Sequence, residues 1–260
     1  MTDLDITQQR TQFNVLLIGD DCLDVYQFGS VERISPEAPV PVFKYGRKEE
    51  VGGMARNVKR NLEELGCNVT YVCGRTSVKT RLIDSRSKQH ILRVDSDAVS
   101  QPLKFEEISH GLRDVDVVVI SDYNKGFVSY ELVEEVVDKF DGAVFIDTKK
   151  HDLARFQGAW VKVNQFEYSQ LKSECTGLIV TLGEEGAIVP HHKIKIQAPS
   201  VEVSDVCGAG DTFLSALAYK WCETQDIKTA IGFAVRAGAI TVQHLGNYAP
   251  TLKEIENDKT

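Results

Sequence analysis

The chain has 260 residues, of which 42% are hydrophobic, so it can form one large domain with a sizeable buried core. The formal net charge of −8 at pH 7 and the isoelectric point near 5.3 argue against a general binder of nucleic acid or of anionic membranes. Any site for a phosphate group must therefore be built locally, from backbone amides and a few Lys or Arg side chains.

The sequence shows no membrane-spanning, secretory or disulfide pattern. It contains no apolar run of about 18 residues, and residues 1–12 are polar and carry acids, unlike a signal peptide. The six cysteines are scattered without a Cys-x-x-Cys pair, which is typical of free, mostly buried thiols in a reducing compartment. We therefore expect a cytoplasmic protein in which residues 1–12 form an N-terminal arm.

The first predicted strand ends in a group of acids. Residues 13–19 are apolar and rich in β-branched side chains, which indicates a buried parallel strand. Asp20, Asp21 and Asp24 follow, where ligands gather at the carboxyl ends of such strands, so these acids are placed for chemistry or lie in a solvated loop. Prolines within residues 36–45 predict a strand at the edge of a sheet.

The next segments predict a helix and then a separate group of strands. Apolar residues with helical spacing predict a helix at 54–65, and residues 67–73 predict a strand. Residues 79–83 and 89–94 predict a half-polar hairpin. Such strands can form a small sheet away from the main core.

From residue 104 onward, helices and strands alternate regularly. Helices are predicted at 105–112, 130–140, 211–224 and 226–243, and strands at 115–121, 143–147, 160–163 and 178–181. This alternation predicts an α/β fold with a doubly wound parallel sheet that is covered by helices on both faces.

The most informative stretch is the turn at residues 205–211 (DVCGAGD), which leads directly into an apolar helix. The first amide N–H groups of a helix lack partners inside the helix, and the helix dipole makes that end positive. Gly208 and Gly210 let a phosphate group approach this backbone closely, and Asp211 lies beside it. A carboxylate there can take a proton from a hydroxyl group that attacks phosphorus, so the turn predicts phosphoryl transfer to an alcohol.

Other interpretations of this turn are weaker or remain open. A dinucleotide-binding fingerprint needs a third glycine where Phe213 stands, and the chain has no Gly-Lys-Ser/Thr run of a P-loop. A tight turn with an Asp cap before a buried helix remains an alternative, because short motifs often match by chance.

Seven motifs occur in the order that one enzyme family has them. They are residues 34–42 (ISPEAPVPV), Gly52-Gly53-x-x-x-Asn57, Arg93-Val94-Asp95, Ser121-Asp122-Tyr123-x-Lys125-Gly126, Asn164-x-x-Glu167, Thr181-x-Gly183-x-x-Gly186 and Gly208-Ala209-Gly210-Asp211. The set resembles the ribokinase-like (PfkB) carbohydrate kinases. Within that family it looks most like the D-glycero-β-D-manno-heptose-7-phosphate kinase domain of the bifunctional ADP-heptose synthesis enzymes. The similarity runs from about residue 14 to about residue 250.

The resemblance implies an architecture. Residues 13–260 would form a single ribokinase-like kinase domain, with a doubly wound, mostly parallel sheet, helices on both faces and a small β-lid. The lid strands would lie at about 31–50 and 79–95, and the lid would join two copies of the chain into a homodimer.

The resemblance also implies roles for individual residues. Asp211 resembles the catalytic base, and Gly208, Ala209 and Gly210 resemble the anion hole for the transferring phosphoryl group. The positions that match the sugar-phosphate site are Asp24, Gly52, Gly53, Asn57, Lys79, Arg81, Arg93, Asp122 and Lys125. The positions that match the ATP side are Asn164, Glu167, Thr181, Gly183 and Gly186, where Glu167 would help to hold Mg²⁺ through water. Taken alone, each motif also has an ordinary structural interpretation, such as a loop or a helix start.

The sequence departs from the family pattern at several places. The segments at 74–79 and 167–177 are shorter than usual, which exposes surface that a partner subunit could cover. Cys207 stands where Thr or Ser is usual, and Val235 stands where an Asn near the adenine is common, so the nucleotide preference stays open.

The leading hypothesis is an ATP- and Mg²⁺-dependent carbohydrate kinase. Its acceptor would be the anomeric hydroxyl of D-glycero-D-manno-heptose 7-phosphate. A kinase for another sugar or sugar phosphate is one alternative, and a non-catalytic sugar-binding relative is another. Neither nucleic acid nor a membrane is expected as a partner.

Overall fold

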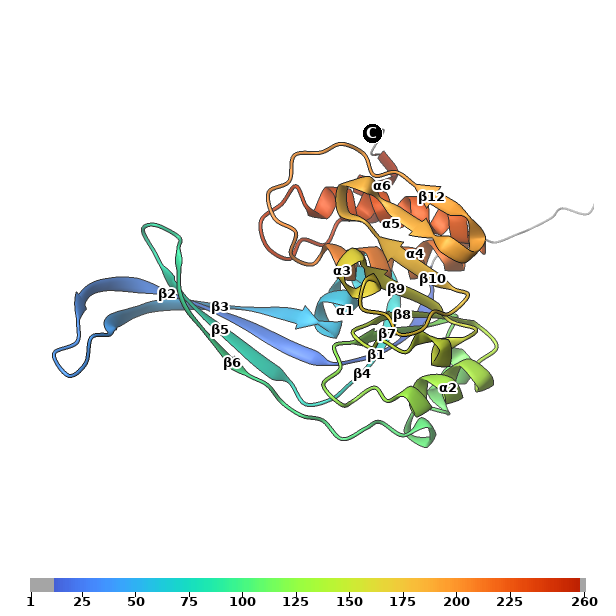
Figure 1. The fold of residues 1–260 in the computed structure, drawn as a ribbon, viewed down its shortest axis with the longest axis horizontal. Coiled ribbons are helices and arrows are strands. Elements are labelled where there is room, and N and C mark those ends of the chain that lie inside the picture. The colour runs from blue at the N-terminus through green and yellow to red at the C-terminus, as the bar shows by residue number, and fades with distance from the viewer. Residues whose placement is uncertain (1–11, 258–260) are drawn as a thin grey trace, which may run out of the picture.

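The computed structural model describes residues 12–257, so the predicted arm at 1–12 lies outside the described residues except for its last position. The chain forms an α/β body from which a long, narrow sheet extends to one side (Figure 1). No helix in the described part of the chain is long and apolar enough to cross a membrane.

The body is built on an eight-stranded sheet. Its order is β12 (Ile194–Ile196), β11 (Ala187–Val189), β10 (Leu178–Thr181), β9 (Trp160–Asn164), β8 (Ala143–Thr148), β7 (Val117–Asp122), β1 (Asn14–Gly19) and β4 (Asn68–Cys73). The strands from β4 to β10 run parallel, whereas β11 and β12 pair antiparallel at one edge. The central strands are rich in Val and Ile and are buried over nearly their whole length, as parallel strands covered on both faces must be.

Helices pack on both faces of this sheet, because successive side chains of a strand point to opposite sides (Figure 1). One core joins Leu17 and Val119 to the helices α1 (Ala55–Glu64), α4 (Ala209–Thr224), α5 (Ile227–Thr241) and α6 (Leu252–Asn257). The other core joins Leu16 and Ile120 to α2 (Tyr130–Lys139). The short helix α3 (Gln165–Tyr168) follows β9. The predicted doubly wound α/β fold is therefore confirmed.

The small sheet has the strand order β3 (Pro41–Met54), β2 (Asp21–Ile34), β5 (Ser77–Asp84) and β6 (His90–Ser96). It begins earlier than the lid strands expected from residue 31, because β2 starts almost directly after β1. Asp21 and Asp24 consequently lie inside a strand and not in a solvated loop. The two long strands β2 and β3 pair antiparallel, and β5 runs parallel to β2.

One predicted helix is wrong. Residues 105–112 form a 3₁₀ turn at Phe105–Glu107, and a second 3₁₀ turn follows at Gly111–Asp114. Ser109 and Gly111 are poor helix formers, which explains why the apolar spacing of this stretch does not produce an α-helix. The strands β11 and β12 and the helices α3 and α6 were not predicted, since such short elements carry too few residues for a periodic pattern.

The order of the strands positions the site. The chain continues from β1 to β4 on one side and later to β7 on the other side, so β1 and β7 flank a topological switch point. Ligands of open α/β sheets bind beyond the carboxyl ends of the strands at such a point. The backbone N–H of Asp20 donates to the Ser121 carbonyl (3.0 Å), which holds the ends of β1 and β7 together there. The small sheet leaves the body at the same edge.

Candidate active site

The predicted turn at residues 205–211 forms an open helix start at this edge. Gly208 precedes α4 with a φ of 77°, and no side chain caps the helix. A side chain at Gly208 would also crowd Asn57, because its Cβ would lie 2.9 Å from Asn57 Nδ2. The Ala209 N–H makes a long hydrogen bond to the Val206 carbonyl (3.4 Å), and the N–H groups that follow at the start of α4 can meet an anion, as expected for a phosphate cradle.

The Asp211 carboxylate lies buried beside this helix start. Asn57 Nδ2 donates to Asp211 Oδ2 (2.8 Å), and the Tyr123 hydroxyl donates to Asp211 Oδ1 (3.2 Å). Burial raises the pKa of Asp211 to about 6, while the hydrogen bond from Asn57 opposes that shift. Asp211 is thus a carboxylate whose proton affinity suits a general base near neutral pH. The site joins the second and the last of the seven motifs, since Asn57 lies on α1 and Asp211 on α4.

Two lysines lie close to the same turn. Lys162 Nζ pairs with Asp147 Oδ2 (2.7 Å), and both side chains are buried. A Cβ on Gly210 would lie only 2.8 Å from Lys162 Nζ, so this ammonium group is at the helix start. Lys149 pairs with Glu167 and lies 3.8 Å from Asp147 Oδ1. The two ammonium groups lie where a phosphate chain would meet the turn, and each is paired with a carboxylate.

Neither lysine was predicted from the sequence as part of the site. Lys149 follows directly after the buried strand β8, and Lys162 interrupts the apolar residues of β9. A lysine inside a buried strand needs a charged partner. The position of Lys162 within an apolar strand was therefore the sequence feature that could have identified it.

Asn164 and Glu167 form the start of α3. Asn164 Oδ1 accepts the Glu167 N–H (2.8 Å), and Glu167 Oε2 accepts the Asn164 N–H (2.8 Å). These two reciprocal hydrogen bonds form a capping box, so the Asn164-x-x-Glu167 motif marks the start of a helix. The other carboxylate oxygen of Glu167, Oε1, accepts a hydrogen bond from Lys149 Nζ at the edge of the site.

The carboxylates of Asp147 and Glu167 fit an Mg²⁺ ion whose other ligands are phosphate oxygens and water. Asp147 Oδ1 is buried and has no hydrogen-bond partner, and Glu167 lies across Lys149 from it. In residues 12–257 there is no group of three or more His, Cys, Asp or Glu residues that could enclose a metal ion. Mg²⁺ commonly needs only one or two protein carboxylates when phosphates supply the other oxygen atoms.

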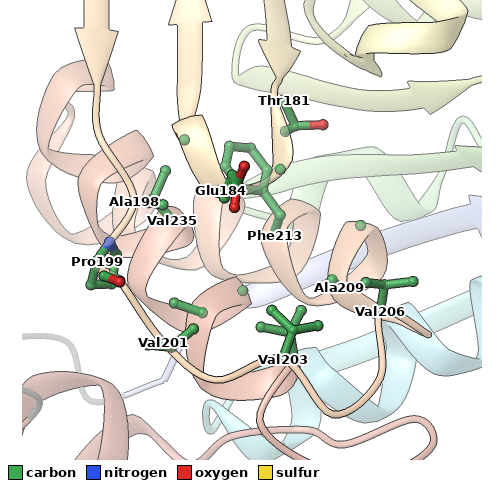
Figure 2. Close-up of a pocket in the computed structure, with 17 residues that line it drawn as sticks. Thr181, Glu184, Ala198, Pro199, Val201, Val203, Val206, Ala209, Phe213 and Val235 are labelled. Carbon is green, nitrogen blue, oxygen red and sulfur yellow. The ribbon is translucent and has the colours of Figure 1, made fainter.

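An apolar pocket of about 380 Å³ adjoins the start of α4 (Figure 2). Thr181, Gly183 and Gly186, which the resemblance assigns to the nucleotide side, line it together with Ala209 and Gly210. Its other walls are mainly apolar and are formed by Pro199, Val201, Val203, Val206, Phe213, Val235, Ala239 and Val242. Figure 2 shows Val235 on the helical wall and Phe213 between the pocket and the strands. The pocket has the size and lining of a site for a flat, partly apolar ligand.

The small sheet presents a polar face to the site. In its register Asp24 lies beside Lys79, and Arg81 lies between Tyr26 and Arg93. Because side chains alternate along a strand, all five are on one face. Arg81 Nη1 pairs with Asp24 Oδ1 (2.5 Å), and Arg93 pairs with Asp95 at an exposed position (2.5 Å).

This face lies next to the turn. Burial raises the pKa of the Cys207 thiol, Asp205 raises it further, and the positive charge of Arg81 opposes the shift. Asn247 connects the small sheet with the turn. Its Nδ2 donates to the Gly52 carbonyl (3.4 Å), and its Oδ1 is so close to Gly208 that a Cβ placed there would lie 3.0 Å away. A side chain at Gly53 would collide with Asp24 Oδ2, so this glycine leaves room for the Asp24 carboxylate, whose side chain is 11% exposed.

Asp122 does not lie where the sequence analysis expected it. Its side chain is completely buried and binds Thr148 Oγ1 (2.6 Å) and Lys150 Nζ (2.7 Å). It therefore holds the segment after β7 in place and is not accessible to a ligand. Lys125, in the same motif, is partly exposed and pairs with Asp97 (2.7 Å).

Asp20 and Asp21 are also structural. Asp20 Oδ2 accepts the backbone N–H groups of Tyr123 (2.8 Å) and Lys125 (3.1 Å), so it shapes the segment after β7. Asp21 binds Arg56 with both carboxylate oxygens (Nε–Oδ1 3.0 Å, Nη2–Oδ2 2.5 Å). Of the three acids after β1, only Asp24 faces the site.

Comparison with known proteins agrees with this geometry. The family model described as pfkB family carbohydrate kinase matches residues 160–254, which include the turn and Asp211. D-beta-D-heptose 7-phosphate kinase of Bordetella bronchiseptica is 30% identical to this chain, over 95% of this chain and 96% of its own length. The chain belongs to the pfkB family of carbohydrate kinases.

Further relatives fit this assignment. The bifunctional protein HldE of Nitratiruptor sp. is 33% identical over 93% of this pfkB kinase, which spans 64% of that relative's length. The crystal structure of ribokinase from Thermotoga maritima has the same fold, with a TM-score of 0.69 at 17% identity over 94% of this chain and 98% of that chain. The family model describes its members as carbohydrate kinases, and kinases of this family use ATP.

Proposed function

We propose that this pfkB kinase transfers the γ-phosphoryl group of ATP to the anomeric hydroxyl of D-glycero-D-manno-heptose 7-phosphate. The single observation that carries the chemistry is the buried Asp211 carboxylate at the open start of α4. Ala209 and Gly210 of the same turn line the apolar pocket, and Cys207 lies within the electrostatic reach of Arg81 and Asp24 on the small sheet. The relatives named for heptose 7-phosphate kinase activity, at about 30% identity, support the choice of sugar.

Asp211 takes the proton of the acceptor hydroxyl as the hydroxyl oxygen attacks phosphorus. The backbone N–H groups of Gly208, Ala209 and Gly210 hold the negative charge that gathers on the transferring group. Lys149 and Lys162 add positive charge on the donor side. Mg²⁺, held through water by Glu167 and Asp147, would neutralise the charge of the phosphate oxygens when it is bound.

The nucleotide base lies in the apolar pocket in this proposal. Thr181, Gly183 and Gly186 approach it from the strand side. Val235 contributes an apolar surface and has no polar group for the base edge, so base recognition depends on stacking and on backbone groups. Asn164 acts from a distance, because its side chain fixes Glu167.

The acceptor sugar lies between the turn and the small sheet. Asp24 and the unpartnered, buried Asn57 Oδ1 are acceptors for sugar hydroxyl groups, and Gly52 and Gly53 leave room for the ring. Lys79, Arg81, Arg93 and Lys125 then supply the charge for a phosphate group on the sugar.

One observation favours a second candidate, a kinase for an unphosphorylated sugar. Arg81, Arg93 and Lys125 each already have a carboxylate partner, so the polar face carries less free positive charge than its count of basic residues indicates. An ADP-release assay over sugars and sugar phosphates separates the two candidates. Turnover that is limited to unphosphorylated sugars would exclude the heptose phosphate.

Replacement of Arg81 and Arg93 tests recognition of the phosphate. In Arg81→Gln and Arg93→Gln variants, we expect the KM for a phosphorylated acceptor to rise about tenfold, because a hydrogen bond between charged groups is lost. The KM for ATP should remain unchanged in the same assay. Arg86→Gln, at an exposed position at the tip of the same hairpin, is the matched control. An equal rise for phosphorylated and unphosphorylated sugars would contradict the assignment.

The pH dependence of kcat/KM for the acceptor tests the base. The ionised form of Asp211 is the active form, and its pKa of about 6 predicts that kcat/KM falls as the pH decreases through 6. An ordinary exposed aspartate would place this acid limb near pH 4, about two pH units lower. Rates measured from pH 5 to 9 at acceptor concentrations below KM decide between these positions of the limb.

We also propose that the small sheet acts as a lid and joins two copies of the chain. Ile34, Val40, Tyr45, Leu92 and Val94 lie exposed on its strands and connections. Burying such side chains against a second lid would remove apolar surface from water. Sedimentation of the wild type and of a Tyr45→Glu variant tests this, and an unchanged monomer in both would reject it.

A further inference from the structure

Tyr123 contacts the Asp211 carboxylate but takes no part in the proposed phosphoryl transfer. It follows β7 directly, and its hydroxyl donates to Asp211 Oδ1 (3.2 Å), while Asn57 holds Oδ2. The charge of Asp211, together with burial, raises the pKa of Tyr123 well above its ordinary value. The phenol is therefore protonated across the working pH range and acts only as a donor toward Asp211.

The surroundings hold the Tyr123 side chain in place. Asp20 Oδ2 accepts the Tyr123 backbone N–H (2.8 Å), and the backbone N–H of Asn124 donates to the buried Asp122 carboxylate (2.8 Å). Lys149 Nζ lies over the Tyr123 ring, 5.2 Å from the ring centroid. Asp20 and Asp122, two buried carboxylates at the end of the sheet, therefore hold the segment that carries Tyr123.

The charged groups around Asp211 act in opposite directions. Asp147, on β8, raises the proton affinity of Asp211, and Lys162, on β9, lowers it. Lys149 adds a positive charge from the segment after β8, and Glu167, on α3, adds a negative charge close to Tyr123. Burial is the largest cause that raises the pKa of Asp211, and the hydrogen bonds from Asn57 and Tyr123 both oppose that shift.

We propose that Tyr123 is a positioning residue for the base: its hydroxyl group fixes the rotation of the Asp211 carboxylate and favours its ionised form. With one protein donor on each carboxylate oxygen, each oxygen keeps a lone pair for the acceptor hydroxyl. Tyr123 and Asn57 therefore orient the base from both sides and leave it open to the substrate. This inference rests on the proposed role of Asp211 as the base.

Tyr123→Phe is the test, because it removes the hydroxyl group and keeps the ring that faces Lys149. We expect the pKa of Asp211 to rise by about one unit, since a hydrogen bond to the ionised form is lost. At pH 6 kcat/KM for the acceptor would then fall about fivefold relative to wild type, whereas any loss at pH 8.5 would be smaller by about that factor. Tyr248→Phe removes a similar bond, to Glu254 (2.7 Å), outside the site and serves as the matched control.

A second readout does not depend on the acceptor. Carboxyl ¹³C shifts of aspartate-labelled protein, titrated without nucleotide or metal, report the pKa of Asp211 directly. The resonance is assigned by its absence from Asp211→Asn. A higher pKa in Tyr123→Phe, with an unchanged value in Tyr248→Phe, supports the inference, and an unchanged or lower value in Tyr123→Phe overturns it.

The two proposals fail in different ways. Full activity of Asp211→Asn would reject the base and the role of Tyr123 together. An inactive Asp211→Asn with an unchanged pKa in Tyr123→Phe would reject only the role of Tyr123.

Discussion

Asp211→Asn is expected to lower kcat about 10³-fold, with much smaller changes in the KM values, because the amide cannot take the proton of the acceptor hydroxyl. The substitution keeps the shape of the side chain, and the helix start, Lys149 and Lys162 remain in place. Some activity should therefore survive from positioning and charge stabilisation. The measurement is ADP release at saturating ATP and acceptor, at pH 8.

The same variant should be more stable than wild type at high pH. The pKa of Asp211 is about 6 in the folded chain and about 3.8 when exposed, so the folded chain holds this proton more tightly. This group's contribution to stability falls as the pH rises from about 4 to 6 and stays low above 6, on the order of 2 to 3 kcal/mol. Thermal unfolding of both proteins at pH 5 and pH 8 measures the difference.

These two measurements together make the result decisive. A variant with low activity and a raised melting temperature at pH 8 has lost its chemistry and kept its fold, as expected where a buried charge serves catalysis and not stability. Equal kcat values for wild type and Asp211→Asn would remove the basis of the proposed mechanism. A variant that does not fold at pH 5 would contradict the assignment of Asp211 as a strained, buried base.

Lys162→Met is expected to have the largest effect on stability. It leaves the buried Asp147 carboxylate without the ammonium group at 2.7 Å, and removing one partner of a buried ion pair costs about 3 to 5 kcal/mol. Urea unfolding measures this loss as a lower midpoint. Lys195→Met, at an exposed position on β12, should change the midpoint little.

A double variant isolates the ion pair. Asp147→Asn combined with Lys162→Met removes both charges and should recover most of the lost stability, because no unpaired charge remains buried. Its kinase activity should stay low, since the donor side of the turn has lost positive charge. If both single variants and the double variant had the wild-type midpoint, the pair would have no role in the fold.

The sequence determined the fold class and the turn before α4, because both depend on local patterns. The apolar runs of β1, β7 and β8 and the helical spacing of α4 and α5 encode each element without reference to its neighbours. The glycines before Asp211 define an open helix start in the same local way. The α/β order could therefore be predicted from local patterns, whereas the placement of Asp211 and Asn57, 154 positions apart, in one site followed only from the resemblance to the pfkB family.

Only the tertiary structure decided which side chains surround Asp211 and which acids are structural. Tyr123 and Asp211 are 88 positions apart, and Lys162 and Asp147 are 15 positions apart on neighbouring parallel strands. Such contacts depend on strand order and register, which no local spacing reports. Burial likewise decides that Asp122 holds a loop while Asp24 faces the site, because the charge of a carboxylate is visible in sequence but its neighbours are not.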